Sequence, residues 1–349
     1  MPTASKDHAG RPAGNKPQPS PEPIFRALNA YQLTDALRAA VELDVFTAVD
    51  EGAVAPAALA ARCKASERGL RILCDSLVVF GLLTKKDGRY GLTPDTAAFL
   101  SRRSPMCMAD VTGFMGHPDV TGRFRDLAGA VRRGGGAPGR DLEGKLDPVW
   151  VDFARSMAPM MRMPAAMMAD ILGAAEGRPW SVLDVAAGHG VFGIALAERN
   201  PKARVLALDW DEVLAVAAEN AAAARLDGRW RRLPGSAFQV DFGSGHDLVL
   251  LTNFLHHFDR AENVALLKKA RACLAPHGRV AVLDFVPAED RVSPPAPASF
   301  ALVMLASTPA GDAYTLSEYE GMFREAGLAR WDVHPLAPTP QTLLVAHRD

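Results

Sequence analysis

The chain has 349 residues, of which 48% are hydrophobic and 23% are charged, and its formal net charge is -1. This composition is ordinary for a soluble protein of two domains, and the small net charge excludes a global attraction to nucleic acid or to an anionic membrane. The four cysteines form no C-x-x-C pair, which argues against a disulfide framework or a structural zinc site and indicates a cytoplasmic protein.

The N-terminal segment, residues 1–22, is rich in Pro, Gly, Lys and Ser and lacks an apolar run. We therefore predict a disordered tail without a signal peptide. No stretch of about 18 consecutive apolar residues occurs, so we expect no transmembrane helix. From Pro23 apolar residues recur every three or four positions, which predicts one helix over residues 23–42.

Residues 54–103 follow the outline of a winged helix: two short helices, a hairpin that turns at Lys86-Asp87-Gly88, and a further helix. Because this stretch has nine Lys or Arg against four Asp or Glu, a DNA-binding regulator is one interpretation. However, Leu70, Ile72 and Leu77 fill the helix that would read DNA, which indicates that this helix packs into a core or against a second copy of the chain. We predict a winged-helix dimerisation domain over residues 23–105.

Residues 106–178 are predicted to be a helical linker that contributes to a substrate pocket, with a Gly- and Pro-rich loop over 132–148. Six methionines crowd residues 157–168, and Pro164 predicts a break into two helices there. Methionine at helical spacing is usually core, although thioethers also form adaptable walls for flat ligands. On the second interpretation, the pocket residues are Met157, Met160, Met161 and, from a later segment, Met304.

Strands and helices alternate over residues 179–349, which predicts an α/β domain with a Rossmann-like parallel sheet. The expected strands cover residues 182–186, 204–209, 230–233, 247–252 and 280–285. The expected helices cover residues 191–199, 211–224, 260–274 and 316–326, and residues 331–335 and 342–346 form a closing antiparallel hairpin. In an open sheet of this kind, ligands bind beyond the carboxyl ends of the strands.

The turn Gly188-His189-Gly190-Val191-Phe192-Gly193 satisfies the G-x-G-x-x-G pattern of dinucleotide sites. Asp184 in the preceding strand argues against a dinucleotide, because a carboxylate would repel a pyrophosphate at the turn. S-adenosylmethionine has no phosphate and brings an ammonium and a sulfonium, which a carboxylate stabilises directly or through water. Asp209, at the end of the next strand, has the chemistry to accept both ribose hydroxyls. The sequence therefore favours S-adenosylmethionine.

Five segments carry a family resemblance: "LDVAAGHG", "LALDW", "GSAFQVDFGSGHDLVLLTNFLHHFD", "GRVAVLDFVP" and "LSEYEGMFREAGL". In this order they are similar to the motifs of small-molecule O-methyltransferases of the caffeate and acetylserotonin type, and the resemblance runs from Ala27 to the C-terminus. It implies a class I methyltransferase fold, a winged-helix homodimer, S-adenosylmethionine as cofactor and a small hydroxylated substrate, aromatic or polycyclic. No nucleic-acid or membrane partner is expected.

The resemblance assigns cofactor contacts to Asp184, Gly188, Gly190 and Asp209, with Ala186 where the family usually has glycine. It also implies that Trp210, Ser236, Ala237 and Phe238 surround the adenine, with Asn253 at the end of a neighbouring strand. Ser236 replaces an aspartate of the family, so this contact carries no charge.

For catalysis, the resemblance implies that His256 is the general base and that Asp284 orients it. Histidine, with an ordinary pKa of about 6.5, is able to take the proton of a phenol as the oxygen attacks. His257 replaces an acidic residue and is expected in the substrate pocket. Two adjacent histidines point in different directions, so no metal site is expected from them. The family's second supporting glutamate aligns with Ala313.

Two further functions remain open. One is an enzyme that keeps the cofactor but methylates carbon or nitrogen, or uses the site for a different reaction. Alternatively, a winged-helix regulator would bind DNA and sense a ligand with the C-terminal half. Because the expected pocket segments carry few charges, we expect a flat and neutral substrate.

Overall fold

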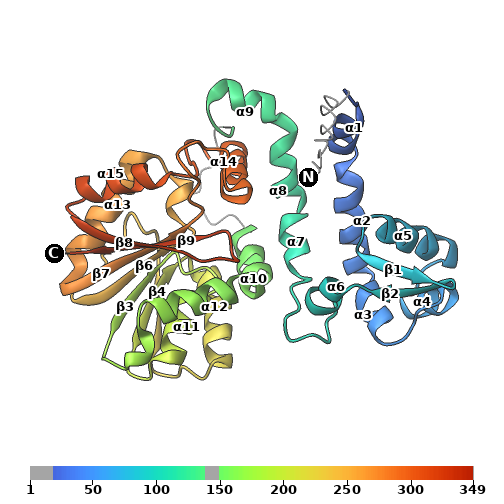
Figure 1. Cartoon of the computed structure of the whole chain (residues 1–349). Coiled ribbons are helices and arrows are strands. Elements are labelled where there is room, and N and C mark those ends of the chain that lie inside the picture. The colour runs from blue at the N-terminus through green and yellow to red at the C-terminus, as the bar shows by residue number, and fades with distance from the viewer. Residues whose placement is uncertain (1–18, 138–148, 349) are drawn as a thin grey trace, which may run out of the picture.

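A computed structural model describes residues 19–137 and 149–348. An N-terminal helical domain and a C-terminal α/β domain lie on either side of a column of short helices (Figure 1). Most of the predicted tail, residues 1–18, and most of the predicted loop, residues 138–148, lie outside the described residues. No helix within the described ranges combines the length and apolarity needed to cross a membrane.

The first apolar stretch forms two helices, α1 (Glu22–Leu28) and α2 (Ala30–Glu42), so the prediction of one continuous helix was wrong at Asn29. Asparagine is a weak helix former because its side chain competes for nearby backbone groups, and Asn29 leaves the helical conformation with φ -96° and ψ 2°. Neither side of α1 is buried in this chain, and Ile24, Phe25, Leu28 and Tyr31 are each about 60% exposed.

The winged helix is present as predicted, with one additional helix. Helices α3 (Val45–Asp50), α4 (Pro56–Arg62) and α5 (Glu67–Val79) precede the hairpin of β1 (Leu83–Lys86) and β2 (Arg89–Leu92), and α6 (Pro94–Phe99) follows it. Asp87 and Gly88 both have positive φ, which matches the twist of a two-residue hairpin turn. The short α3 was not predicted, although its Phe46 lies in the core of this domain.

The connecting column consists of α7 (Val111–Met115), α8 (Pro118–Thr121), η1 (Gly122–Asp126) and α9 (Leu127–Arg133). It leads to α10 (Val149–Ile171), which is continuous, so the predicted break at Pro164 was wrong. A proline inside a helix costs about 3 kcal/mol because one hydrogen bond is lost. Burial offsets this cost, since Met161, Ala165 and Met168 pack into the core beside α11 (Val191–Arg199).

Seven strands form the sheet of the α/β domain, in the order β5-β4-β3-β6-β7-β9-β8. Their bounds are β3 (Ser181–Val185), β4 (Arg204–Asp209), β5 (Trp230–Pro234), β6 (His246–Thr252), β7 (Leu274–Asp284), β8 (Arg330–Pro335) and β9 (Thr342–His347). The first five are parallel, and β9 pairs antiparallel with both β7 and β8, which confirms the predicted sheet and closing hairpin. The strand order reverses between β3 and β6, where an open sheet binds its ligand.

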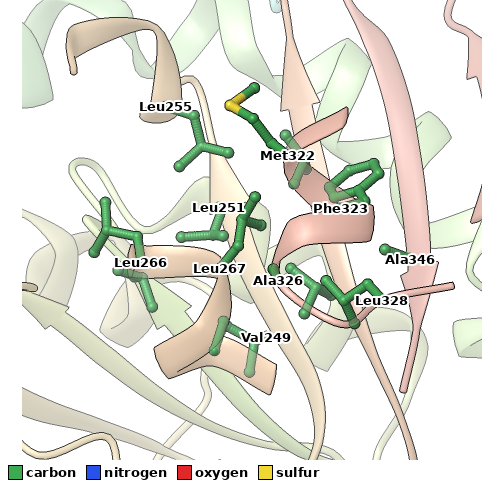
Figure 2. Close-up of a cluster of buried hydrophobic side chains, with 14 of the residues drawn as sticks. Val249, Leu251, Leu255, Leu266, Leu267, Met322, Phe323, Ala326, Leu328 and Ala346 are labelled. Carbon is green, nitrogen blue, oxygen red and sulfur yellow. The ribbon is translucent and has the colours of Figure 1, made fainter. Parts of the chain in front are cut away.

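Helices cover both faces of this sheet, and the side chains of β6 alternate between them. Leu248 and Leu250 face the layer of α10 and α11, next to which α12 (Asp211–Ala223) packs. Val249 and Leu251 face α13 (Arg260–Cys273) and α15 (Leu316–Glu325), as Figure 2 shows. The remaining elements are η2 (Ala174–Glu176), η3 (Leu255–His257) and α14 (Pro295–Ser307). Because both faces are packed, the carboxyl ends of the strands form a rigid base for a site.

Candidate active site

A cavity of about 720 Å³ lies beyond the carboxyl ends of β3, β4 and β6. Its largely apolar walls, with a few polar groups among them, are typical of a site for a small organic molecule. Its lining residues are Trp150, Phe153, Ala186, Ala187, Gly188, His189, Phe192, Asp209, Trp210, Val213, Thr252, Asn253, Phe254, His257 and Phe258. A second hollow, of about 380 Å³, shares Asp209 and Trp210 with it and extends to Ser236, Ala237 and Phe238. The two together form an elongated site.

The glycine turn between β3 and α11 has three residues in the left-handed region, with φ of 53° at Ala186, 55° at Gly188 and 74° at Gly190. Glycine adopts this conformation freely, whereas an alanine there costs roughly 1 kcal/mol. Ala186 therefore carries the strain that a glycine of the family pattern would avoid. The turn brings the backbone N–H of Gly188 toward Asp209.

Asp209 ends β4 on the wall shared by both hollows. Its Oδ2 accepts from the N–H of Gly188 at 2.8 Å, and its Oδ1 accepts from the N–H of Trp210 at 2.7 Å. Burial raises the pKa of Asp209 to about 6. Each carboxylate oxygen keeps a second lone pair, so the group has the capacity to accept both hydroxyls of a ribose.

Asp184 lies beneath the glycine turn and not on the wall of the cavity. It is fully buried, its Oδ2 accepts from the N–H of Gly193 at 3.1 Å, and its Oδ1 has no partner in the described part of the chain. Burial and, to a lesser extent, the charge of Asp209 raise the pKa of Asp184 to about 7. A buried acceptor without a partner is costly, and a nearby cation or ordered water relieves that cost.

The second hollow is lined by small and aromatic side chains. The hydroxyl of Ser236 accepts from the N–H of Phe238 at 3.3 Å, and Phe238 meets Phe258 edge to face at 4.9 Å. Ala237 lines the same hollow. Asn253, with φ of 50°, lines the larger cavity, and its amide points at the sulfur of Met161 at 3.5 Å.

His256 lies in η3 and belongs to a chain of three buried polar side chains. Its Nδ1 is 2.6 Å from Oδ1 of Asp284, whose Oδ2 accepts from the hydroxyl of Tyr319 at 2.9 Å. Because a carboxylate only accepts, Nδ1 carries the proton and Nε2 keeps its lone pair. Burial and the charge of Asp284 raise the pKa of Tyr319 well above its ordinary range, so this phenol remains a donor.

Tyr319 was not predicted as a site residue. It belongs to α15, which the sequence predicted over residues 316–326, and its spacing with Met322 and Phe323 marks only a core face. At the position of the family's second supporting glutamate, Ala313 has no polar side chain, and neighbouring Asp312 pairs with Arg291 at 3.2 Å. The additional hydrogen bond in this network comes from Tyr319 and is made to Asp284.

The ring of His256 faces aromatic neighbours, and it meets Phe300 of α14 edge to face at 4.8 Å. His256 itself is buried and does not line the larger cavity, whereas the adjacent His257 does. The two ring centroids are 4.3 Å apart. Burial, followed by the charge of His256, lowers the pKa of His257 well below its ordinary value, and its Nδ1 has no partner among the described residues.

A backbone contact fixes the segment that supports these histidines. Gly311 packs so closely that an added Cβ would collide with the carbonyl oxygen of His256. Upstream, the carbonyl of Thr308 accepts from the N–H of Gly136 at 2.7 Å, just beyond α9. Main-chain contacts thus connect the end of α9 with the histidine pair.

The predicted methionine wall is not part of this cavity. Met157, Met161 and Met304 are buried, Met160 packs beside the core, and none of the four lines the cavity, in contrast to His257. The face of α10 that meets the cavity instead carries Trp150 and Phe153, one turn apart near its N-terminal end. Sequence spacing alone did not define how α10 is rotated about its axis.

Comparisons with known proteins agree with this arrangement. Residues 153–329 match the O-methyltransferase domain, and residues 25–102 match the O-methyltransferase dimerisation domain. A 3-hydroxy-5-methyl-1-naphthoate 3-O-methyltransferase of Streptomyces sahachiroi is 28% identical over 84% of this chain and 85% of its own.

Two solved structures are similar over almost the whole chain. A putative O-methyltransferase from Nostoc punctiforme is 47% identical, with a TM-score of 0.90 over 95% of this chain and 100% of that one. Human N-acetylserotonin methyltransferase, solved in complex with S-adenosylmethionine, is 22% identical, with a TM-score of 0.81 over 96% of this chain and 99% of that one.

The chain belongs to the O-methyltransferase family that has an N-terminal dimerisation domain, which confirms the resemblance found in the sequence. It is an S-adenosylmethionine-dependent O-methyltransferase with a class I α/β fold, and its substrates are small molecules.

Proposed function

We propose that this enzyme methylates a hydroxyl group of a small aromatic or polycyclic molecule, with His256 as the general base. The observation that carries the proposal is the buried chain from Tyr319 through Asp284 to His256, with contacts of 2.9 Å and 2.6 Å. A base needs one ring nitrogen protonated and held, and the other with a lone pair. Asp284 supplies that arrangement for His256.

In this mechanism Nε2 of His256 takes the proton of the substrate hydroxyl, and the oxygen becomes a nucleophile. The resulting imidazolium is stabilised by the carboxylate of Asp284, which is itself held by Tyr319. When bound, S-adenosylmethionine supplies an electrophilic methyl group on a sulfonium. The closely packed aromatic neighbours of His256 exclude water, which strengthens these electrostatic interactions.

The residues of the two hollows fit S-adenosylmethionine. Asp209 would accept from the ribose hydroxyls, while Trp210, Ser236, Ala237 and Phe238 would surround the adenine. Gly188, Gly190 and Asn253 would shape the space for the methionine part. The orphaned oxygen of Asp184 suits a cationic cofactor, acting through ordered water because the residue lies beneath the turn.

The substrate proposal is based on the aromatic side chains near the histidine pair. Phe300 and Phe285 stack at 4.1 Å next to His256, and Trp150 meets His257 edge to face at 5.4 Å. Flat aromatic rings pack well against such side chains. His257 would offer a neutral polar contact beside the acceptor hydroxyl. The predicted pocket residues Met157, Met160, Met161 and Met304 do not line this cavity, so the substrate proposal does not depend on them.

Product analysis tests this function. The enzyme is incubated with methyl-labelled S-adenosylmethionine and a panel of hydroxyarenes, aryl amines and activated aromatic carbons, and the labelled atom is located by mass spectrometry and NMR. We expect the label on oxygen. Label on carbon or nitrogen would support the alternative acceptor, and binding of the cofactor without any transfer would support a non-methylating relative.

We also propose that the working form is a cytoplasmic homodimer. The exposed residues Phe25, Leu28 and Tyr31 of α1 and α2 lie within the matched dimerisation domain. Ile72 and Val79 of α5 and the adjacent Phe80 are exposed as well. All four thiols are free, as in a reducing compartment. On α5, Arg71 and Asp75 pair at 3.2 Å, which weakens the case for DNA. Ultracentrifugation at low micromolar concentration should show a dimer, whereas a monomer, or a salt-dependent shift of duplex DNA, would contradict the proposal.

A further inference from the structure

The glycine turn carries a histidine that the mechanism above does not use. His189 lies between Gly188 and Gly190, is only 3% exposed, and lines the larger cavity. Its ring stacks against Phe153 of α10 at 6.0 Å and lies 5.9 Å from Phe192. Close packing against two aromatic side chains restricts the rotation of this polar ring at the cavity wall.

The backbone determines which nitrogen of His189 is protonated. The N–H of Val191, the first residue of α11, donates to Nδ1 of His189 at 3.2 Å. An imidazole nitrogen that accepts a hydrogen bond has a free lone pair, so the proton of the neutral ring is on Nε2. Burial lowers the pKa of His189 to about 4, so the ring is neutral at physiological pH. Nε2–H is therefore a donor, and it has no partner in the described part of the chain.

The cavity otherwise contains few groups for a negative ligand. Its described lining residues include no Lys or Arg. Asp209 and the nearby Asp184 are acceptors that suit the hydroxyls and cationic groups of S-adenosylmethionine. The α-carboxylate is the only anionic group of that cofactor, and the N-terminus of α11, where backbone N–H groups concentrate, favours an anion.

We propose that Nε2–H of His189 donates a hydrogen bond to the α-carboxylate of S-adenosylmethionine, at the N-terminal end of α11. The contact uses the neutral ring, so it recognises the carboxylate without a salt bridge. This inference depends on cofactor binding alone and does not depend on His256 as the base or on the identity of the substrate.

The test compares S-adenosylmethionine with decarboxylated S-adenosylmethionine, which keeps the adenosine, sulfonium and amine. Isothermal titration calorimetry is performed on the full-length protein without acceptor substrate. His189→Phe keeps an aromatic ring against Phe153 and removes the donor. We expect it to weaken S-adenosylmethionine binding by about 10-fold to 100-fold, the range for a hydrogen bond to a charged group, and to leave the decarboxylated ligand nearly unchanged.

Two further variants make the test specific. Trp150→Phe removes another N–H donor from the same wall, and we expect it to leave the ratio of the two affinities unchanged. His189→Gln restores an N–H donor and should recover part of the preference for the carboxylate. If thermal melting shows that His189→Phe does not fold, the ratio of the two affinities is measured with His189→Ala, which also lacks the donor.

The proposal is overturned if the variants without a donor weaken both ligands equally, because His189 would then only shape the turn. It is also overturned if Trp150→Phe removes the preference while His189→Phe keeps it. In either case methyl transfer by wild-type enzyme would be unaffected, so failure here is distinguishable from failure of the proposed function.

Discussion

The proposed site has a histidine at each end, and the two differ in whether Nε2 carries a lone pair or a proton. At the substrate end, Nδ1 of His256 faces the carboxylate of Asp284, which leaves a lone pair on Nε2. At the cofactor end, Nδ1 of His189 faces the N–H of Val191, which leaves a proton on Nε2. The same side chain is thus an acceptor in one place and a donor in the other, according to the group that holds its second nitrogen. The substrate end should therefore control rate, and the cofactor end should control affinity.

The largest expected effect is at the substrate end. His256→Ala should lower the rate of methyl transfer by roughly 10²-fold to 10⁴-fold, the usual contribution of general base catalysis, while calorimetry should give nearly unchanged affinity for S-adenosylmethionine. At high pH the substrate hydroxyl ionises without assistance, so part of the rate should return.

The matched control for that experiment is His257→Ala, which should have little effect on the rate. Asp284→Asn should give a milder defect than His256→Ala in the same direction. If His257→Ala is inactive and His256→Ala is not, the base has been assigned to the wrong histidine.

At the cofactor end, Asp209→Ala should weaken S-adenosylmethionine binding by about 1.5 to 3 kcal/mol, because two ribose hydroxyls lose a charged acceptor. Titration calorimetry measures the change directly. With saturating cofactor the rate should largely recover, in contrast to the His256 variant. Unchanged affinity would remove Asp209 from the site.

The carboxyl groups of Asp184 and Asp209 should make the stability of the cofactor-free protein depend on pH. The pKa values of Asp184 and Asp209, about 7 and about 6, lie above those of unfolded aspartate, so the folded state retains protons that the unfolded state loses between about pH 4 and 7. The free energy of unfolding should therefore fall as pH rises through this window, by roughly 7 kcal/mol for the two groups together, since each pH unit between the unfolded and folded pKa values is worth about 1.4 kcal/mol.

Thermal melting at a series of pH values measures this dependence. Asp184→Asn should make the melting temperature depend less steeply on pH, because the buried amide carries no charge at any pH in the window. A wild-type melting temperature that rises between pH 5 and 7, with no change in slope in the variant, would contradict the assignment of these two groups.

The smallest effect concerns the phenol behind the substrate end. Tyr319→Phe removes one hydrogen bond to Asp284 and should lower the rate by about threefold to tenfold, corresponding to a net contribution near 1 kcal/mol. Cofactor affinity should stay the same. The pH dependence of the rate distinguishes a positioning role from a general loss of stability, since only the former shifts the profile of His256. A rate and a pH profile identical to those of the wild type would show that Tyr319 does not act through Asp284.

Much of this arrangement was predictable because it depends on local patterns. The turn at Gly188 and Gly190 follows from strand, glycine and helix signals within a short segment, and Asp87-Gly88 specifies its hairpin by conformation alone. The features that the sequence did not predict depend on tertiary contacts. Burial keeps α10 continuous through Pro164, and Tyr319 reaches Asp284 across 35 positions of the chain. The proposed role of His189 depends on the N–H of Val191, which points at Nδ1 only when the turn is folded.

The contacts of Gly136 and Gly311 with their neighbours have a mechanical consequence. Because the N–H of Gly136 binds the carbonyl of Thr308, and Gly311 packs against the backbone of His256, displacement is transmitted through main-chain atoms, which deform less than side chains. Any tilt of α9 relative to the sheet must therefore move the 308–311 segment and, with it, the backbone beneath the histidine pair.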